Sequence, residues 1–227
     1  MIEIEGLSKT FTLHNQHGAA IPVLAGVDLT VCAGECVVLV GESGAGKSTL
    51  MRMIYANYRA ASGRIGVRHD GAWVDIAAAE PRLVLDVRRR TMGYVSQFLR
   101  VIPRVSALDI VAEPLRVLGL EPELARARAR NLLERLHVPA NLWDLPPATF
   151  SGGEQQRINI ARSFAFDFPI LLCDEPTAAL DSVNRQIVVE LIQEARTRGG
   201  AIVGIFHDPE VRDAVASRLF PVKRLAS

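Results

Sequence analysis

The fold is decided by the stretch Cys36-Val37-Val38-Leu39-Val40-Gly41-Glu42-Ser43-Gly44-Ala45-Gly46-Lys47-Ser48. Its first five residues are apolar, which is typical of a strand that is buried on both faces of a sheet. A glycine-rich loop follows, and the segment from Lys47 to Tyr58 then carries apolar residues at helical spacing: Leu50, Met53 and Ile54. A buried strand, a glycine-rich loop and a helix in this order predict an α/β fold with a largely parallel sheet.

The glycine-rich loop also predicts chemistry, because it matches the P-loop pattern G-x-x-x-x-G-K-[ST]. Glycines let backbone N–H groups turn toward a phosphate, and the helix N-terminus attracts negative charge. Lys47 would contact the β- and γ-phosphates, and the Ser48 hydroxyl would ligate Mg²⁺. The predicted nucleotide-binding residues of this segment are Gly41, Glu42, Ser43, Gly44, Ala45, Gly46, Lys47, Ser48 and Thr49. The alternative is a glycine-rich turn that holds a lysine by chance. The scarcity of lysine disfavours it, since the chain has only Lys9, Lys47 and Lys223.

A second apolar run ends in two carboxylates, Leu171-Leu172-Cys173-Asp174-Glu175. A carboxylate at the end of a strand beside the P-loop strand can hold Mg²⁺ through water, which is the Walker B role and is predicted for Asp174. Glu175 can orient or deprotonate the attacking water. The alternative, an acidic strand end that faces solvent, becomes a minor option beside a P-loop. Together the two motifs predict an NTPase.

Composition limits the other possibilities. The 49% hydrophobic and 22% charged fractions exclude a disordered or fibrous chain. A net charge of +1 is too balanced for a surface that binds nucleic acid over the whole fold. The cysteines make neither an even disulfide framework nor a metal-ligand spacing, so Cys32, Cys36 and Cys173 are expected to be small buried hydrophobes in a reducing compartment.

The N-terminus has no basic and no apolar region of a secretion signal, and no apolar stretch approaches the roughly 20 residues that cross a bilayer. These observations predict a cytoplasmic chain without direct membrane insertion.

Around the P-loop, short strands are expected within residues 1–40, a hairpin over 62–80 with its turn at Asp70-Gly71, and a strand over 92–95. The pattern is helical from 106 to 137, and α/β from 151 onward, which favours a helical insertion into the sheet domain.

The segment Phe150-Ser151-Gly152-Gly153-Glu154-Gln155-Gln156-Arg157 resembles the signature sequence of ATP-binding cassette (ABC) ATPases. Phe150 and Glu154 depart from the usual signature without removing a phosphate-contacting group. The resemblance implies that Ser151, Gly152 and Gly153 face the γ-phosphate bound to another subunit. It also implies a P-loop NTPase fold of the ABC type, with an N-terminal antiparallel β subdomain. The whole chain, 1–227, would be one ABC domain whose α/β core spans 1–97 and 151–227 and whose helical subdomain spans about 98–150.

Four further residues match the remaining sequence motifs of the family: Phe11, Gln97, Asp181 and His207. The resemblance implies that Gln97 is a Mg²⁺ ligand and γ-phosphate sensor, that Asp181 belongs to the D-loop, and that His207 hydrogen-bonds the γ-phosphate. Phe11 either stacks on adenine or is a core phenylalanine. ATP and Mg²⁺ are therefore the expected cofactors. The expected catalytic residues are Lys47, Glu175 and His207, and the expected metal ligands are Ser48, Gln97 and Asp174.

The motifs discussed so far leave open which partner protein the predicted ATPase acts on. Residues 96–115 and 147–157 are similar to the L-type ATP-binding subunit of the bacterial carbon–phosphorus lyase system, which degrades phosphonates and makes α-D-ribose 1-methylphosphonate 5-triphosphate. This resemblance implies a homodimer, or a heterodimer with a second cassette, that acts on the lyase core complex. The alternative is the ATPase subunit of an ABC exporter or lipoprotein-release transporter. A P-loop phosphotransferase is disfavoured because it needs no Ser-Gly-Gly signature. Five arginines suit an acidic partner or form a solvated basic face: Arg88, Arg89, Arg90, Arg100 and Arg104.

Overall fold

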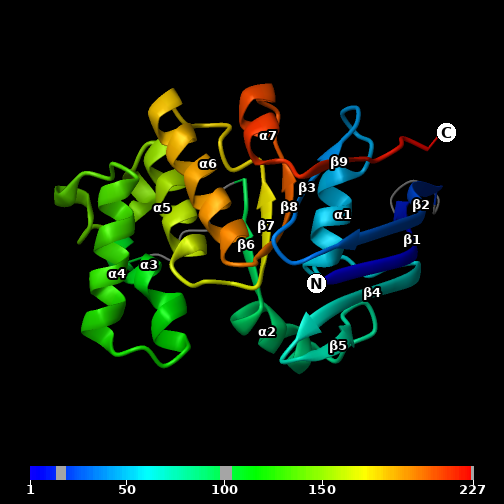
Figure 1. The fold of residues 1–227 in the computed structure, drawn as a ribbon, viewed down its shortest axis with the longest axis horizontal. Coiled ribbons are helices and arrows are strands. Elements are labelled where there is room, and N and C mark those ends of the chain that lie inside the picture. Colours follow the sequence, from blue (N-terminus) through cyan, green and yellow to red (C-terminus); the bar gives the residue numbers. More distant parts are fainter. Residues whose placement is uncertain (14–18, 98–103, 226–227) are drawn as a thin grey trace.

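A computed structural model describes residues 1–13, 19–97 and 104–225, and Figure 1 shows their arrangement. Two sheets organise the molecule, one antiparallel and one parallel. The predicted fold class is confirmed. Arg100 and the rest of 98–103 lie outside the described residues.

The parallel sheet has the strand order β6-β7-β8-β3-β9. Its strands are β3 (Cys36–Val40), β6 (Met92–Val95), β7 (Ile170–Asp174), β8 (Ala201–Ile205) and β9 (Arg218–Pro221). All four strand pairs are parallel, and Asp174 pairs with Ile205. Parallel strands end at one edge of their sheet, so the loop after β3 and the carboxylates after β7 are brought to the same edge, on either side of β8.

The antiparallel sheet has the order β2-β1-β4-β5. Its strands are β1 (Ile2–Leu13), β2 (Ala19–Val31), β4 (Ser62–His69) and β5 (Ala72–Asp75). Asp70 and Gly71 join β4 to β5 with φ values of 47° and 80°. Two positive φ angles fit the twist of a two-residue hairpin, which confirms the turn expected at this dipeptide.

The helices are α1 (Lys47–Ile54), α2 (Pro81–Arg90), α3 (Ala107–Val117), α4 (Pro122–Arg135), α5 (Gly152–Phe164), α6 (Ser182–Thr197) and α7 (Pro209–Val215). Short 3₁₀ turns lie at Ala140–Leu142 and Pro147–Thr149. In Figure 1, α3, α4 and α5 gather on the side of the parallel sheet that is remote from the antiparallel sheet. Among the helices of the described residues, none is long and apolar enough to cross a membrane.

Two helices differ from the sequence expectation. α1 ends at Ile54 rather than near Tyr58, and Ala56 has a left-handed φ of 57°, which no helix continues through. α2 was not predicted, because a run of arginines hid its short apolar face. Pro81 opens α2 at a position where the missing N–H costs nothing, and Val87 is its buried residue.

Side chains of the parallel strands alternate between two cores. Val38 and Cys173 point into the core that includes α3, α5 and α6, whereas Val37 and Leu172 point into the core shared with α1 and the antiparallel sheet. Burial on both faces explains why these strands are continuous apolar runs. α1 is thereby packed between the two sheets, which holds the P-loop against the end of β3.

The cysteines are not equivalent. Cys36 and Cys173 are fully buried, as expected, but Cys32 is exposed at the end of β2, so its predicted burial is wrong. Burial raises the pKa of the Cys36 thiol to about 12, and burial also raises the pKa of Cys173. Thiolates are the reactive form, so both buried thiols are inert in the native protein.

We therefore expect Ellman's reagent to modify one thiol of the native protein rapidly and all three after unfolding in guanidinium. Cys32→Ser removes the fast phase and serves as the control. A fast phase that persists in Cys32→Ser would show that the second or third thiol is accessible.

Candidate active site

The predicted P-loop wraps the N-terminus of α1, and two of its glycines are required by their surroundings. A Cβ on Gly41, at φ 147°, would lie 2.4 Å from the carbonyl oxygen of Val222. A Cβ on Gly46, at φ 98°, would lie 2.9 Å from a methyl of Leu24. Both the conformation and the space therefore exclude other side chains, which explains the glycine spacing.

Lys47 folds back over this loop. Its ammonium group donates hydrogen bonds to the carbonyl oxygens of Gly41 (2.8 Å) and Glu42 (2.9 Å). Gly46 is the N-cap of α1 and supplies no side-chain acceptor to the first turn. A mobile cation and uncapped N–H groups at a helix N-terminus form an anion site, so these residues fit the phosphates of a nucleotide.

The Asp174 carboxylate is the most buried acidic group at this edge, with 4% of the residue exposed. The Ser48 hydroxyl lies 3.4 Å from its Oδ1, and the Tyr94 hydroxyl donates to its Oδ2 at 2.8 Å. A hydroxyl and a carboxylate are hard oxygen ligands, which is the donor set that Mg²⁺ prefers. The structure thus brings together Ser48 and Asp174, two of the predicted metal ligands.

Tyr94 was missed by the sequence analysis. It lies on β6, where it pairs with Leu172 of β7, so its side chain reaches the end of the strand that carries Asp174. Burial, together with the charge of Asp174, raises the pKa of the Tyr94 hydroxyl well above its usual range. The hydroxyl therefore keeps its proton and remains a donor to the carboxylate at all working pH values.

Glu175 is held between two predicted γ-phosphate sensors. The amide of Gln97 donates to its Oε2 at 3.2 Å, and Nε2 of His207 lies 2.7 Å from its Oε1. Glu175 has a left-handed φ of 54°, a conformation that a non-glycine residue adopts only when its surroundings impose it. This backbone turn directs the carboxylate away from Asp174 and toward Gln97 and His207.

The signature segment builds a helix start elsewhere in the molecule. Ser151 caps α5 in a capping box: its hydroxyl accepts from the Glu154 N–H (3.3 Å), and Glu154 accepts from the Ser151 N–H (2.8 Å). The Ser151 hydroxyl also donates to the Glu154 carboxylate at 2.7 Å, and this bond, together with the one from the Ser151 N–H, lowers the pKa of Glu154. α5 packs on α3 and α4, whereas α1 contacts β7 and β8. Within one chain α5 and α1 belong to different cores, so the signature segment is not brought to the P-loop.

Asp181 and Phe11 remain predictions as nucleotide contacts. Asp181 caps α6 by accepting from the Asn184 N–H at 2.8 Å, and this bond lowers its pKa. Phe11 is half-buried rather than a core residue. Its ring meets the edge of Tyr58 at 5.4 Å between centroids, and the Lys9 ammonium lies 4.8 Å from its centroid.

The arginine run is only partly available to a partner. Arg88, expected to be exposed, donates instead to the carbonyl oxygen of Tyr55 at 2.9 and 2.6 Å and to Asn57 at 2.9 Å. Arg90 pairs with Asp86 and, at 2.7 Å, with Asp70. Arg89 and Arg104 are exposed. Pairing of Arg88 with the distant Tyr55 carbonyl oxygen, and of Arg90 with Asp86 and Asp70, therefore corrects the expectation for these two arginines.

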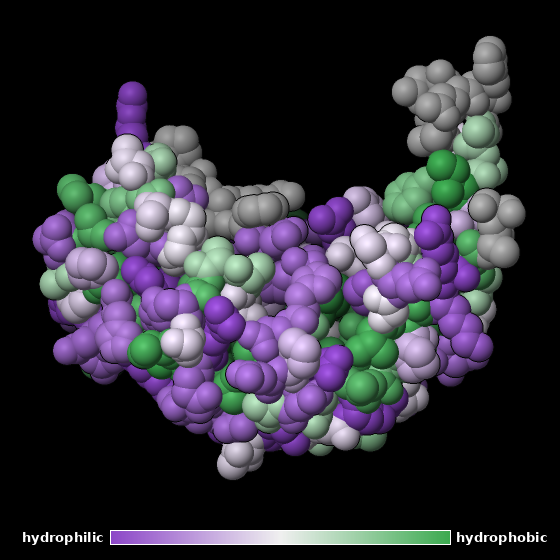
Figure 2. Space-filling view, turned by 90° about the horizontal axis from the view of Figure 1, so that it is seen from above, coloured by the Kyte–Doolittle hydropathy of each residue, from purple (hydrophilic) through white to green (hydrophobic). Residues whose placement is uncertain are grey.

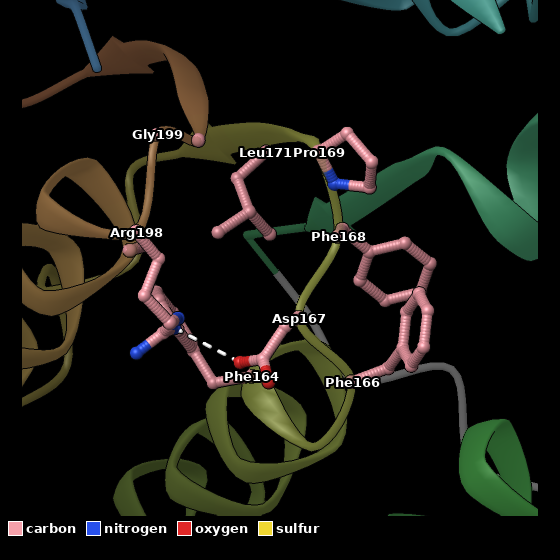
Figure 3. Close-up of a pocket in the computed structure, with 10 residues that line it drawn as sticks. Phe164, Phe166, Asp167, Phe168, Pro169, Leu171, Arg198 and Gly199 are labelled. Atoms are coloured by element: carbon pink, nitrogen blue, oxygen red, sulfur yellow. Dashed lines mark ion pairs between the residues drawn. The ribbon is translucent and has the colours of Figure 1, made fainter. Parts of the chain in front are cut away.

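A cluster of possible metal ligands and a cavity lie outside this site, and neither contributes to it. His69, Asp70 and Asp86 could place ligand atoms within 4.8 Å of one another, but Arg90 already neutralises both carboxylates. A cavity of about 210 Å³ lies at the start of β7, the end opposite Asp174, and Figure 3 shows the residues that line it. Asp167 at this cavity pairs with Arg198 (3.1 Å, dashed) and with Arg128 (2.8 Å), so its charge is satisfied.

Comparison with known proteins agrees with this geometry. The family model described as ABC transporter matches residues 24–178. The chain belongs to the ABC transporter family. It carries the family's ABC ATPase domain, a fold that in general binds ATP with Mg²⁺ and hydrolyses it.

Relatives of this ABC domain include the macrolide export ATP-binding/permease proteins MacB of Shigella flexneri and Marinobacter nauticus. They are 33% and 35% identical over 223 and 211 residues, or 98% and 93% of this chain. The chain spans about a third of the length of these relatives (33% and 32%). A dimeric structure of the ABC transporter cassette MJ0796 is 30% identical, with a TM-score of 0.87, covering 98% of this chain and 94% of that one.

Proposed function

We propose that the chain is the ATP-binding and ATP-hydrolysing cassette of an ABC exporter, and that it acts on the cytoplasmic face of a membrane. The observation that carries the catalytic part is the placement of Glu175 between Gln97 and His207, next to Asp174 and the P-loop. The exporter part is supported by the export proteins among the relatives. The face shown in Figure 2 is mostly hydrophilic, with hydrophobic patches between the polar side chains.

Each residue has a task in this proposal. The N–H groups of the loop and the Lys47 ammonium bind the β- and γ-phosphates, and Ser48, Gln97 and Asp174 hold Mg²⁺. Bound there, Mg²⁺ would neutralise charge that develops on the phosphates. Glu175 accepts the proton of the attacking water, while His207 and Gln97 hold its carboxylate in position.

The proposed working unit is a head-to-tail dimer. In one chain α5 and α1 pack in different cores, so we infer that Ser151, Gly152 and Gly153 reach a γ-phosphate on a second subunit. A single chain would leave the nucleotide open to solvent. The likeness to a cassette whose solved structure is dimeric supports this arrangement.

The proposed docking site for the membrane partner is a groove of about 410 Å³ between α2, β6, α3 and α5. Leu85 and Val117 supply exposed apolar surface, and Arg89 supplies a charge at its side. Arg162 is paired with Glu113 across the groove at 2.8 Å. A partner segment with apolar and acidic side chains fits this lining.

We expect Arg89→Glu to weaken association with the partner by tenfold or more, which is about 1.4 kcal/mol, because the charge at the groove is reversed. ATP affinity of the isolated chain should stay unchanged. Arg130→Glu, an exposed arginine on α4, is the matched control. Quantitative pull-down from detergent-solubilised cells measures both variants, and equal recovery would argue against the groove.

A second candidate function is service to the carbon–phosphorus lyase core complex. It rests only on the resemblance inferred from the sequence of residues 96–115 and 147–157, of which 98–103 lie outside the described residues, whereas the export proteins among the relatives favour the exporter. Mass spectrometry of the proteins that co-purify with a tagged chain separates the two proposals. A membrane permease supports the exporter, and lyase subunits support the second candidate.

A further inference from the structure

Tyr94 connects the proposed docking groove to the proposed Mg²⁺ site. Its ring lines the groove, while its hydroxyl donates to Oδ2 of Asp174 at 2.8 Å. The other oxygen, Oδ1, faces Ser48 at 3.4 Å. The Tyr94 side chain thus contacts both the proposed docking groove and the carboxylate that is proposed to hold the metal.

The ring of Tyr94 is held by a stack. It lies 4.7 Å from the ring of Tyr55 with an interplanar angle of 22°. The guanidinium of Arg88 lies 4.4 Å from the Tyr55 centroid and is itself anchored to the Tyr55 carbonyl oxygen. Arg88, Tyr55 and Tyr94 form a continuous wall of the groove, and the hydroxyl at its inner end touches Asp174.

We propose that Tyr94 is a positioning residue for the metal ligand Asp174, and that the Arg88–Tyr55–Tyr94 stack makes metal affinity depend on the state of the groove. Mg²⁺ demands near-ideal octahedral geometry, so the carboxylate that would hold it must be kept in one orientation. The Tyr94 hydroxyl occupies Oδ2 and leaves Oδ1 beside Ser48. Hydrogen bonds to a ligating carboxylate commonly change metal affinity by 10- to 100-fold.

The stack explains how the groove can act on this orientation. A hydrogen bond weakens steeply as its length and angle change, so a small shift of the Tyr94 ring changes its hold on Asp174. A segment that packs against Tyr55 and Arg88 shifts or clamps that ring. This route involves neither Gln97 nor His207, and it rests on the proposed Mg²⁺–ATP site.

The test is metal binding by Tyr94→Phe, which keeps the ring and removes the hydroxyl. ATP is titrated calorimetrically into the whole chain with EDTA and with Mg²⁺, and Mn²⁺ binding to the ATP complex is followed by electron paramagnetic resonance. We expect Mn²⁺ affinity to fall about tenfold, with metal-free ATP affinity unchanged. Tyr55→Phe, which removes a hydroxyl from the same stack but keeps both rings, is the matched control.

A double-mutant cycle tests the stack. Tyr55→Leu removes the neighbouring ring and should lower Mn²⁺ affinity in the wild-type background but not in Tyr94→Phe. Wild-type Mn²⁺ affinity in Tyr94→Phe, or an equal effect of Tyr55→Leu in both backgrounds, overturns the inference. If Tyr94→Phe does not fold, wild-type affinity in Tyr55→Leu overturns it. If the ATP affinity of the wild-type chain does not depend on Mg²⁺, the proposed Mg²⁺ site is overturned as well. If only the expected loss of Mn²⁺ affinity in Tyr94→Phe is absent, that site stands.

Discussion

ATP hydrolysis slows by about 100-fold or more when Glu175 is replaced by Gln, because the amide cannot accept the proton of the attacking water. The Gln side chain still fits between Gln97 and His207, and Asp174 and the P-loop are untouched. Nucleotide and Mg²⁺ should therefore bind as before. Because ATP is not hydrolysed, a dimer with two ATP molecules at its interface should accumulate. A ligand that binds only the dimer stabilises the dimer.

Phosphate release and sedimentation velocity measure these two effects. Glu134→Gln, an exposed glutamate on α4, is the control and should hydrolyse ATP at the wild-type rate. A Glu175→Gln chain that remains monomeric at saturating ATP would mean that the composite site is wrong or that a different subunit completes it. Full activity in Glu175→Gln would assign the general base to another residue.

ATP affinity should fall by about 100-fold or more in Lys47→Ala, since two charge-assisted contacts to phosphate are each worth about 1.5–3 kcal/mol. The chain should stay folded, because within the described part of the structure the Lys47 ammonium donates to the carbonyl oxygens of Gly41 and Glu42 in an exposed loop. Calorimetry with Mg²⁺–ATP measures the affinity, and thermal unfolding checks the fold.

Lys223→Ala, an exposed lysine near the C-terminal end of the described residues, is the matched control for loss of a positive charge. It should bind ATP with wild-type affinity. A folded Lys47→Ala chain with unchanged affinity would show that the glycine-rich loop is a turn that holds a lysine by chance.

Some elements could be predicted from the sequence because their signals are local. The strand β3, the loop after it and the start of α1 are consecutive in the chain, so periodicity and glycine spacing suffice to place them. The Ser151 capping box and the Asp70-Gly71 turn are likewise decided by residues within four positions of one another. The short, arginine-rich α2 shows the limit, since its single buried residue, Val87, gives little periodic signal.

Other features depend on residues that are distant in the chain. The expectation that Arg88 is exposed failed because its partner, the Tyr55 carbonyl oxygen, lies 33 positions away. Cys32 was expected in the core because cysteine is usually buried, but it follows the last buried residue of β2 and lies outside. Exposure and pairing of such residues depend on how the sheets and α2 pack.

The P-loop, the carboxylates at the end of β7, the signature helix and hence the ATPase chemistry follow from the sequence, because each is a continuous motif whose geometry depends on neighbouring residues. The contacts between these motifs depend on the folded chain. The register of β6 against β7 brings Tyr94 to Asp174 across 80 positions of chain, and the parallel strand ends bring Gln97 and His207 to Glu175. The physical reason is that hydrogen bonds between strands depend on sheet order and register, which are set by the packing of the two cores on either face.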